Sequence, residues 1–414
     1  MSRALIRSNR DYRLLLSASA MSNLGDGIAM VALPWLATLL TRDPLLIAAV
    51  ATAQRLPWLL LALPAGVWTD RADRPLLMMR ADLVRTVLMI FIVLMVVAQT
   101  GLPLADDASP VAILSLIVIA FLFGSAEVLR DNAAQTVLPS IVAHADLERA
   151  NGQMWSAEQI TGQFIGPPLA GMLIAAAVVW PFGIDASIYA LSALLIWMVA
   201  LPPRKAGVTK RFWIALREGL GWMRHNPAIL RLAIMLGVIN AVFIGGMTIL
   251  VLYAQEVLGL SATGYGLLLS FGAMGGVAGG LLAPVVAARL GMRRSLLLAL
   301  GGFVIVQLMI GLFGSAAIVA AALFLEAAAG MLWNVVTVSY RQRLIPDDLL
   351  GRVNSVYRFF GWGAMPFGAM GAGVLVTLLT PVLGRNEALH APYLFAALIC
   401  GLLTLYAMMR LRFD

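Results

Sequence analysis

Long apolar runs, broken at intervals by proline, glycine or charged residues, are the main feature of the chain. Each run is close to the roughly 20 apolar residues that a helix needs to cross a bilayer core. Inside that core the backbone must satisfy its own polar groups, which runs of this length do as helices. The predicted spans cover residues 14–40, 45–68, 76–99, 110–136, 152–178, 181–201, 228–254, 262–288, 295–314, 316–340, 353–379 and 390–409. We therefore predict an all-α membrane protein with about twelve transmembrane helices.

The composition agrees with lipid as the solvent of this chain. Of its 414 residues 61% are hydrophobic and 12% are charged, and the mean hydropathy is +0.91. Soluble domains carry about 25% charged residues. Little sequence remains for a separate soluble domain. Cys400 is the single cysteine, which excludes an internal disulfide and every multi-cysteine metal motif, and we expect no metal site and no cofactor.

Basic residues mark the topology. Four arginines between residues 3 and 13 precede the first apolar run, and no short apolar segment with a cleavage site is present, so we expect a retained first helix. When the connections are assigned alternately to the two sides, most of the 29 Lys and Arg fall on one side. The positive-inside bias then places both termini in the cytoplasm. The net charge of +8 is explained by this pattern, and we expect no nucleic-acid partner.

The longest connection divides the predicted spans into two sets of six. We predict an N-terminal half at 1–201, a cytoplasmic linker at 202–227 and a C-terminal half at 228–414. The linker has apolar residues at helical spacing with arginines between them, which predicts an amphipathic helix on the anionic inner leaflet. Residues 149–152 (RANG) and 352–355 (RVNS) are a weak internal repeat. Two repeats around a central site are typical of transporters.

The connection after the second span carries a motif. It places Gly66 before Asp70 and Arg71, followed by Arg74. This resembles the signature loop of the major facilitator superfamily, although Asp73 replaces its second glycine. The resemblance implies that Asp70 docks on the start of the eleventh helix, near Gly351 and Arg352, and closes an inner gate, with Arg71 and Arg74 as anchors. The alternative is that these residues only enforce topology.

The fifth span carries a second motif. Gly162, Gly166, Pro167 and Gly171 resemble the antiporter motif of the same superfamily, with Ala170 in place of one glycine. The whole chain is similar to bacterial multidrug, macrolide and siderophore exporters of this superfamily. This resemblance implies two six-helix halves with a central cavity. The arginine that the family often carries in its fourth helix is missing, because Ala120 stands there, so any relay role is either absent or performed by another group.

Ionisable groups deep in a span are costly and are therefore functional candidates. We select Asp26 as the first candidate for proton coupling, because glycines flank it near the middle of the first span. Glu127 and Glu326 are the further candidates. The alternative for Asp26 is a packing role paired with Arg55, and for Glu127 an internal pair with Arg130.

For several further polar residues we expect a structural role. The spans place four of them nearer the cytoplasmic ends of the helices, where ion pairing costs less: Asp82, Arg85, Glu158 and Arg358. Arg55, Arg130 and Arg358 are the expected charge partners of the acids. Asp185 is expected at the outer interface.

Aromatic residues in the second half could line a substrate cavity. Trp333 and Trp362 are the candidates, with lipid-facing packing as the alternative.

These observations predict a secondary transporter that exports amphipathic organic compounds by proton antiport, as a monomer in the bacterial inner membrane. One alternative is a dedicated siderophore or secondary-metabolite exporter. Another is a non-transporting receptor or assembly partner. The chain has no nucleotide-binding loop and no histidine pair at metal spacing, so we expect neither an enzyme nor an ATP-driven pump, and no catalytic residue.

Overall fold

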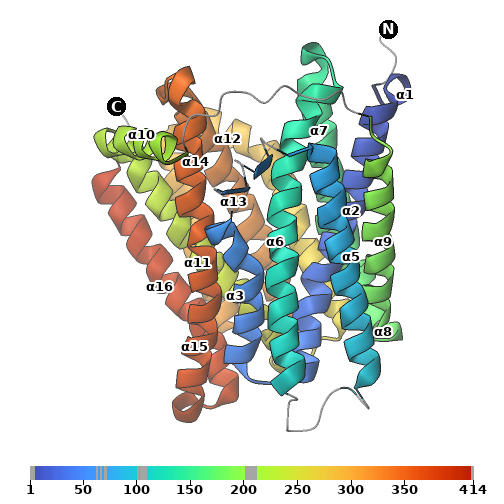
Figure 1. Cartoon of the computed structure of the whole chain (residues 1–414). Coiled ribbons are helices and arrows are strands. Elements are labelled where there is room, and N and C mark those ends of the chain that lie inside the picture. Colours follow the sequence, from blue (N-terminus) through green and yellow to red (C-terminus); the bar gives the residue numbers. More distant parts are fainter. Residues whose placement is uncertain are drawn as a thin grey trace. The chain divides into compact units, whose positions relative to one another are not determined.

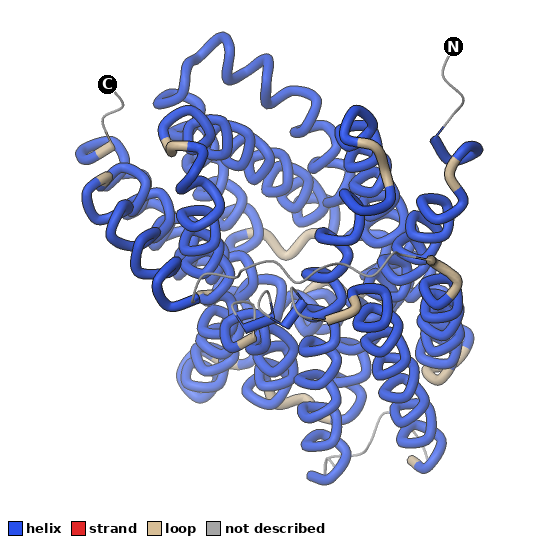
Figure 2. The backbone as a smooth tube through the Cα atoms, turned by 45° about the horizontal axis from the view of Figure 1, so that its top comes forward, coloured by secondary structure: helices blue, strands red, loops and turns tan. Residues whose placement is uncertain are grey.

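The computed structural model describes residues 5–61, 64–65, 68–69, 72–99, 102, 110–200 and 212–411. Within these ranges every regular element is a helix, as Figure 2 shows by colour. The earlier helices are α1 (Leu5–Ser8), α2 (Arg10–Leu40), α3 (Pro44–Leu60), α5 (Arg74–Ala98), α6 (Pro110–Ile141), η1 (His144–Asp146), α7 (Leu147–Glu158), the π-helical η2 (Gln159–Ile165), α8 (Gly166–Ala176) and α9 (Trp180–Trp197). The later helices are α10 (Phe212–His225), α11 (Pro227–Glu256), α12 (Ala262–Leu312), α13 (Ala316–Leu344), α14 (Asp347–Gly363), α15 (Met365–Leu383) and α16 (Arg385–Arg410) (Figure 1).

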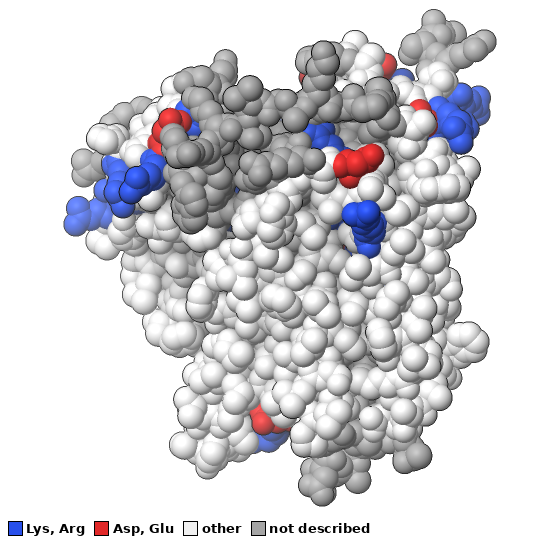
Figure 3. Space-filling view, in the orientation of Figure 1, with Lys and Arg blue, Asp and Glu red and all other residues white. Residues whose placement is uncertain are grey.

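Nine helical segments in the described part of the chain are long and apolar enough to cross a membrane. They are Arg10–Leu40, Arg74–Ala98, Pro110–Ile141, Trp180–Trp197, Pro227–Glu256, Ala262–Leu312, Ala316–Leu344, Leu349–Leu383 and Arg385–Arg410. The helix Pro44–Leu60 is apolar but shorter. On the face drawn in Figure 3, the described charged side chains lie toward the two ends of the helices, and the band between them is uncharged. This distribution is what a hydrocarbon layer requires.

One of these segments changes direction in its middle. α12 is 51 residues long, and Gly291 within it has a φ of 73° and a ψ of 172°, which is not helical. A positive φ is accessible to glycine at little cost. The chain therefore forms two consecutive helical segments there, on either side of a short basic stretch that includes Arg289 and Arg293.

The chain divides into two compact units. The first comprises Met1–Arg42, Ala53–Thr209 and Ser261–Leu267, and the second comprises Asp43–Thr52, Lys210–Leu260 and Leu268–Asp414. In the first unit α9 packs along α2 and α5, and α5 packs along α6. In the second unit α11 packs against α14 and α15. Because α9 packs against both α2 and α5, polar residues on the facing sides of these helices are removed from lipid.

Local capping explains where two of the helices of the first unit begin. The Asn9 side chain accepts a hydrogen bond from the backbone N–H of Tyr12 across 2.9 Å and caps α2. Asp73 caps α5 by accepting from the N–H of Leu76 across 3.1 Å. Caps of this kind satisfy a backbone donor that the first turn leaves free. The residue that departs from the signature loop, Asp73, thus starts the next helix.

The predicted linker contains α10, which belongs to the second unit. Met223 on α10 is fully buried, whereas Arg217 and Arg224 are exposed. Glu218 forms an ion pair with Arg352 of α14. The described part of this amphipathic helix therefore packs against α14 through its apolar face and one ion pair.

Candidate functional site

A buried ion cluster occupies the centre of the first unit, and Arg85 of α5 connects its members. The Arg85 guanidinium donates to Oδ1 of Asp26 across 2.7 Å and to the Ser22 hydroxyl across 2.9 Å. It also forms an ion pair with Asp82, one turn earlier on the same helix. The guanidinium carbon lies 4.4 Å from the centre of the Tyr189 ring. Charge-assisted hydrogen bonds and the aromatic face together fix this guanidinium in one position.

A second arginine completes the cluster. Nε of Arg130 on α6 lies 3.4 Å from Oδ1 of Asp82. The hydroxyl of Ser192 on α9 donates to the other Asp82 oxygen across 2.6 Å. Asp82 and Arg85 are fully buried and Arg130 is 2% exposed. A buried carboxylate with two guanidinium groups and a hydroxyl donor has the partners that burial of its charge requires.

Asp131 also lies 3.9 Å from Arg130 at the edge of the cluster. Asp26 and Asp82, when ionised, match the charges of Arg85 and Arg130. Among these four side chains Asp26 is the one with substantial exposure, at 26%. The Tyr189 hydroxyl donates to Asp26 across 2.8 Å, and it reaches the same Oδ1 that Arg85 contacts. No described group donates a hydrogen bond to Oδ2 of Asp26. Asp26 is therefore the member of the cluster that combines exposure with an acceptor oxygen that has no donor among the described residues.

The pairings differ from those expected from the sequence. Asp26 is bonded to Arg85, not to Arg55, and Arg55 instead lies 3.9 Å from Glu127. Arg130 points to Asp82 and not to Glu127. The physical reason is that α5 places Asp82 between Arg85 and Arg130, so Arg130 binds Asp82, while Arg85 reaches both Asp82 and Asp26. The Glu127 and Arg55 side chains are 16% and 31% exposed, and their separation makes a loose pair.

The sequence did not predict the burial of three further residues. Asp82 and Arg85 are fully buried at the contacts of α5 with its neighbours. Asp185 of α9, expected at the outer interface, is also fully buried within the protein. Neither of its carboxyl oxygens has a hydrogen-bond partner in the described part of the chain. A Cβ atom added at Gly25 would lie 2.6 Å from one of them, so α2 covers this carboxyl closely.

The antiporter-like motif lies where helices of the first unit approach each other closely. A Cβ atom added at Gly27, next to Asp26, would fall on the carbonyl oxygen of Gly162. One at Gly166 would collide with the backbone of Gly27. Gly162 lies in the π-helical η2, which follows directly from α7 and continues into α8. The motif therefore permits backbone contact between α2 and η2 next to Asp26.

The rest of the motif contacts the start of α12. A Cβ atom at Gly171 would lie 2.5 Å from the carbonyl oxygen of Ala262. One added at Gly266 would fall on the carbonyl oxygen of Pro167. Thr263 donates its hydroxyl hydrogen to the carbonyl of Gly171 across 3.2 Å. Gly171 and Gly266 thus have a packing reason for being glycine.

The signature loop falls largely outside the described residues, which do not include Gly66, Asp70 and Arg71. Arg74 is described, and it donates to the carbonyl oxygen of Thr136 on α6 across 2.7 Å. It therefore joins the start of α5 to α6.

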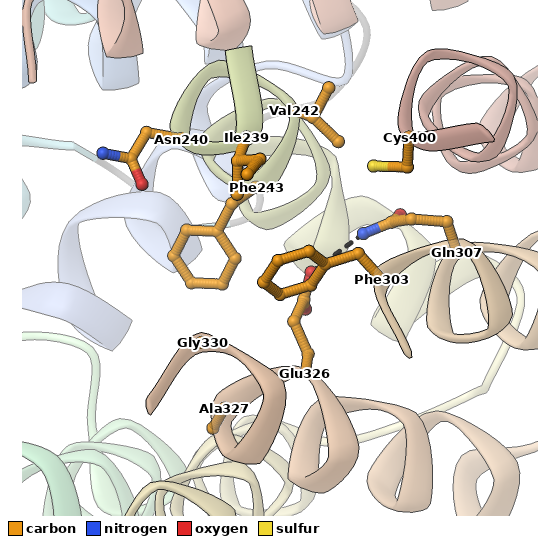
Figure 4. A pocket seen from close by; sticks show the side chains of 10 residues that line it. All are labelled: Ile239, Asn240, Val242, Phe243, Phe303, Gln307, Glu326, Ala327, Gly330 and Cys400. Atoms are coloured by element: carbon orange, nitrogen blue, oxygen red, sulfur yellow. Dashed lines mark hydrogen bonds between the residues drawn. The ribbon is translucent and has the colours of Figure 1, made fainter. Parts of the chain in front are cut away.

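Glu326 occupies a separate site in the second unit. It lies on α13, is 8% exposed and accepts a hydrogen bond from Nε2 of Gln307 on α12 across 2.8 Å. Figure 4 shows these two side chains facing each other, with Phe303 and Phe243 beside them and Cys400 nearby. The residues line a cavity of about 200 Å³. In contrast to Asp26, Glu326 has no Lys or Arg nitrogen within 4 Å among the described residues.

A larger cavity of about 350 Å³ adjoins the first and shares four of its lining residues, Ile239, Asn240, Phe303 and Gly330. Trp333 and Trp362 both line it. Trp333 is 3% exposed, and its indole Nε1 has no hydrogen-bond partner in the described chain. The Arg358 guanidinium lies over the Trp362 ring, 4.6 Å from its centre. Arg358 thus lies beside an aromatic wall of this cavity.

Among the described residues no group of three or more His, Cys, Asp or Glu side chains has the arrangement of a metal site. Cys400 is buried and not in a disulfide.

Comparisons with known proteins agree with one another. The family model described as Major Facilitator Superfamily matches residues 15–369. The multidrug efflux pump Tap of Mycolicibacterium fortuitum is 26% identical over 399 residues, which cover 93% of this chain and 92% of that protein. Tap of Mycobacterium tuberculosis H37Rv is 26% identical over 405 residues, covering 93% of this chain and 90% of the relative.

Solved structures show the same fold at lower identity. A bacterial homologue of the iron transporter ferroportin in an inward-facing state aligns with a TM-score of 0.76 at 18% identity, over 99% of this chain and 100% of that chain. The nucleoside transporter NupG aligns with a TM-score of 0.70 at 12% identity, over 97% of this chain and 100% of the other.

Proposed function

Because the chain belongs to the Major Facilitator Superfamily and is a multi-pass helical membrane protein, we propose that it exports amphipathic organic compounds by proton antiport across the bacterial inner membrane. Support for export comes from Tap, a multidrug efflux pump that matches nearly the whole chain. Support for proton coupling comes from the ion cluster around Asp26. A cavity that could receive part of a small organic molecule contains Trp333 and Trp362 together with polar residues such as Arg358.

The proposed architecture is about twelve transmembrane helices in two six-helix halves that alternate between inward-open and outward-open states, with both termini cytoplasmic. Two features of the structure support more spans than the nine apolar segments. The break at Gly291 divides the 51-residue α12 into two segments. The consecutive α7, η2 and α8 run from Leu147 to Ala176, which is long enough for a further crossing.

The observation that carries the proposal is the position of Asp26 at the exposed edge of the ion cluster. A proton bound to Oδ2 of Asp26 removes one negative charge, and the remaining three side chains then carry a net positive charge. Arg85 keeps Asp82 as a partner, so its bond to Asp26 is the one that weakens. Because α2 carries Asp26 and α5 carries Arg85, proton binding changes a contact between these two helices.

Antiport further requires that proton and substrate favour different states or compete for one state. Asp26 is the first proton carrier in this proposal, and Glu127, which is loosely paired with Arg55, is the second. Glu326 is a further candidate. For the gating loop, the resemblance to the family supports a closing contact by Asp70, with Arg74 anchoring the loop through α6.

The proposal is tested by flux in proteoliposomes that contain the purified protein. A panel of structurally unrelated amphipathic fluorescent compounds is followed with an imposed pH gradient, with the gradient collapsed by an ionophore, and in protein-free liposomes. We expect gradient-dependent movement of several unrelated compounds. Movement of a single compound class would favour a dedicated metabolite exporter, and binding without any flux would favour a receptor. Either result overturns the proposal.

A further inference from the structure

We propose that three arginines at one end of the second unit bind the phosphate group of an anionic phospholipid. They are Arg231 on α11, Arg293 on α12 and Arg410 at the end of α16, and we call them the arginine triad. None of the three lines the cavities described above. The proposal concerns the lipid around the protein and does not depend on the transport function.

Hydrogen bonds at the end of α16 bring the triad together. Nη1 of Arg231 donates to the carbonyl oxygen of Arg410 across 2.8 Å. Nη2 of Arg293 donates to the carbonyl oxygen of Met408 across 2.9 Å. Carbonyl groups in the last turn of a helix lack an intrahelical donor, and these two arginines supply one. Both guanidinium groups therefore lie at one helix end, beside Arg410.

No described acid balances the charge of the triad. Among the described residues, no carboxylate oxygen forms an ion pair with Arg231, Arg293 or Arg410. A guanidinium group carries five N–H donors, so the bonds to the α16 carbonyls leave donors free on each arginine. Like charges held at one helix end repel one another, and a bound anion offsets that repulsion. A phosphate group offers the negative charge and the acceptor oxygens that guanidinium groups bind well.

Two helix starts add positive potential at the same end of the unit. α11 begins at Pro227, about one turn before Arg231. The second segment of α12 begins after the break at Gly291, two residues before Arg293. The N-terminal end of a helix carries a partial positive charge that favours phosphate groups. The fold thus directs two helix dipoles toward the place where the arginines gather.

Exposed apolar side chains beside the triad indicate that the phosphate belongs to a lipid. Ile234 is exposed and lies three residues after Arg231, on the same face of α11. Leu298 on α12 is exposed, as are Leu405 and Met409 on α16. A phospholipid joins a charged phosphate to acyl chains, which matches arginines next to an apolar surface. Basic sites between membrane helices are typical of anionic headgroups.

Thermal unfolding of the purified protein in mixed micelles tests the site. Dioleoylphosphatidylglycerol is titrated at constant detergent concentration. Dioleoylphosphatidylcholine supplies the same chains without net charge, and glycerol 3-phosphate supplies the charge without the chains. A ligand that binds the folded state raises the unfolding midpoint, so the titration gives an apparent affinity. We expect a saturable rise with phosphatidylglycerol that shrinks at high salt, and no comparable rise with the other two compounds.

Single substitutions locate the binding site. Arg231→Gln and Arg293→Gln should each weaken the apparent affinity for phosphatidylglycerol at least about tenfold, because each removes a charged donor. Arg410→Gln should also weaken binding. It serves as a further variant if the other two do not fold, because the exposed Arg410 side chain takes no part in the bonds to the α16 carbonyls. Arg10→Gln is the matched control, because Arg10 is an exposed arginine of the first unit and its loss removes the same charge. This control should keep the wild-type affinity.

Each outcome decides for or against the site. Stabilisation by phosphatidylglycerol that is lost in the triad variants and kept in Arg10→Gln supports it. Equal stabilisation by phosphatidylcholine would show that the acyl chains alone act, and an equal loss in Arg10→Gln would show attraction by net charge alone. Stabilisation by glycerol 3-phosphate would assign the triad to a soluble phosphate compound. Each of these three results overturns the lipid site, whether or not the protein transports a compound.

Discussion

Nη1 of Arg85 lies 2.7 Å from Oδ1 of Asp26, although 59 residues separate them in the chain. The contact joins α2 to α5 in the interior of the first unit. Because Arg85 also binds Asp82, its position does not depend on Asp26 alone. A change in the charge of Asp26 therefore alters the contact between the helices without releasing the arginine into lipid.

The interior acid Asp82 should be needed for stability. Asp82→Asn leaves Arg85 buried with Asp26 as its remaining carboxylate, and Arg130 with the longer 3.9 Å contact to Asp131. Breaking a buried pair by removing one partner costs about 3–5 kcal/mol. We expect a marked fall in the thermal unfolding midpoint of the detergent-purified protein. The exposed pair gives a control: Glu256→Gln should cost no more than about 1 kcal/mol, because the Glu256 and Arg385 side chains are 25% and 32% exposed. Equal shifts in the two variants would contradict this assignment.

Asp185 should behave in the opposite way. It is fully buried, and neither of its oxygens accepts a hydrogen bond from a described group. An unpaired ionised carboxylate is costly to bury, so its neutral isostere should be tolerated. We expect Asp185→Asn to leave the unfolding midpoint unchanged or to raise it. A loss of stability as large as that of Asp82→Asn would show that Asp185 has an ionic partner.

Two neighbouring glycines of α12 provide a matched pair for helix packing. A Cβ atom at Gly275 would fall on the carbonyl oxygen of Phe324 in α13, whereas one at Gly276 would have Ala327 Cβ at 3.9 Å as its near neighbour. Alanine also favours helix over glycine by about 1 kcal/mol. Gly275→Ala should therefore destabilise the protein, and Gly276→Ala should be neutral or stabilising. Thermal unfolding of both variants measures this. Similar effects at the two positions would argue against close contact of α12 with α13.

Helix locations were predictable because they depend on local sequence. The apolar runs at 110–136, 228–254 and 316–340 correspond to α6, α11 and α13, with ends that differ by several residues. The predicted break between 262–288 and 295–314 also falls at Gly291, since glycine and several arginines interrupt the apolar pattern there. The π-helical turns of η2 have no such local signal, because they accompany contact with α2.

The polar contacts were not predictable because they depend on which helices pack together. The sequence does not show that α2 covers Asp185 closely and leaves its carboxyl fully buried. It predicts a structural role for Arg85 nearer the cytoplasmic end of its span, and the hydrogen bond from Arg85 to Asp26 has no local signal. The absence of the family arginine at Ala120 is consistent with two alternatives, an absent relay role or one performed by another group, and the sequence did not identify Arg85 as that group.

The central claim is that proton binding at Asp26 couples the gradient to transport. The direct measurement compares two activities of Asp26→Asn in proteoliposomes: exchange of labelled substrate without a gradient, and uphill accumulation driven by a pH gradient. We expect exchange to persist, because substrate binding and rocking remain, and accumulation to fall at least about tenfold. Glu148→Gln, at an exposed acid of α7, should keep both activities. Accumulation by Asp26→Asn at the wild-type level would contradict the account.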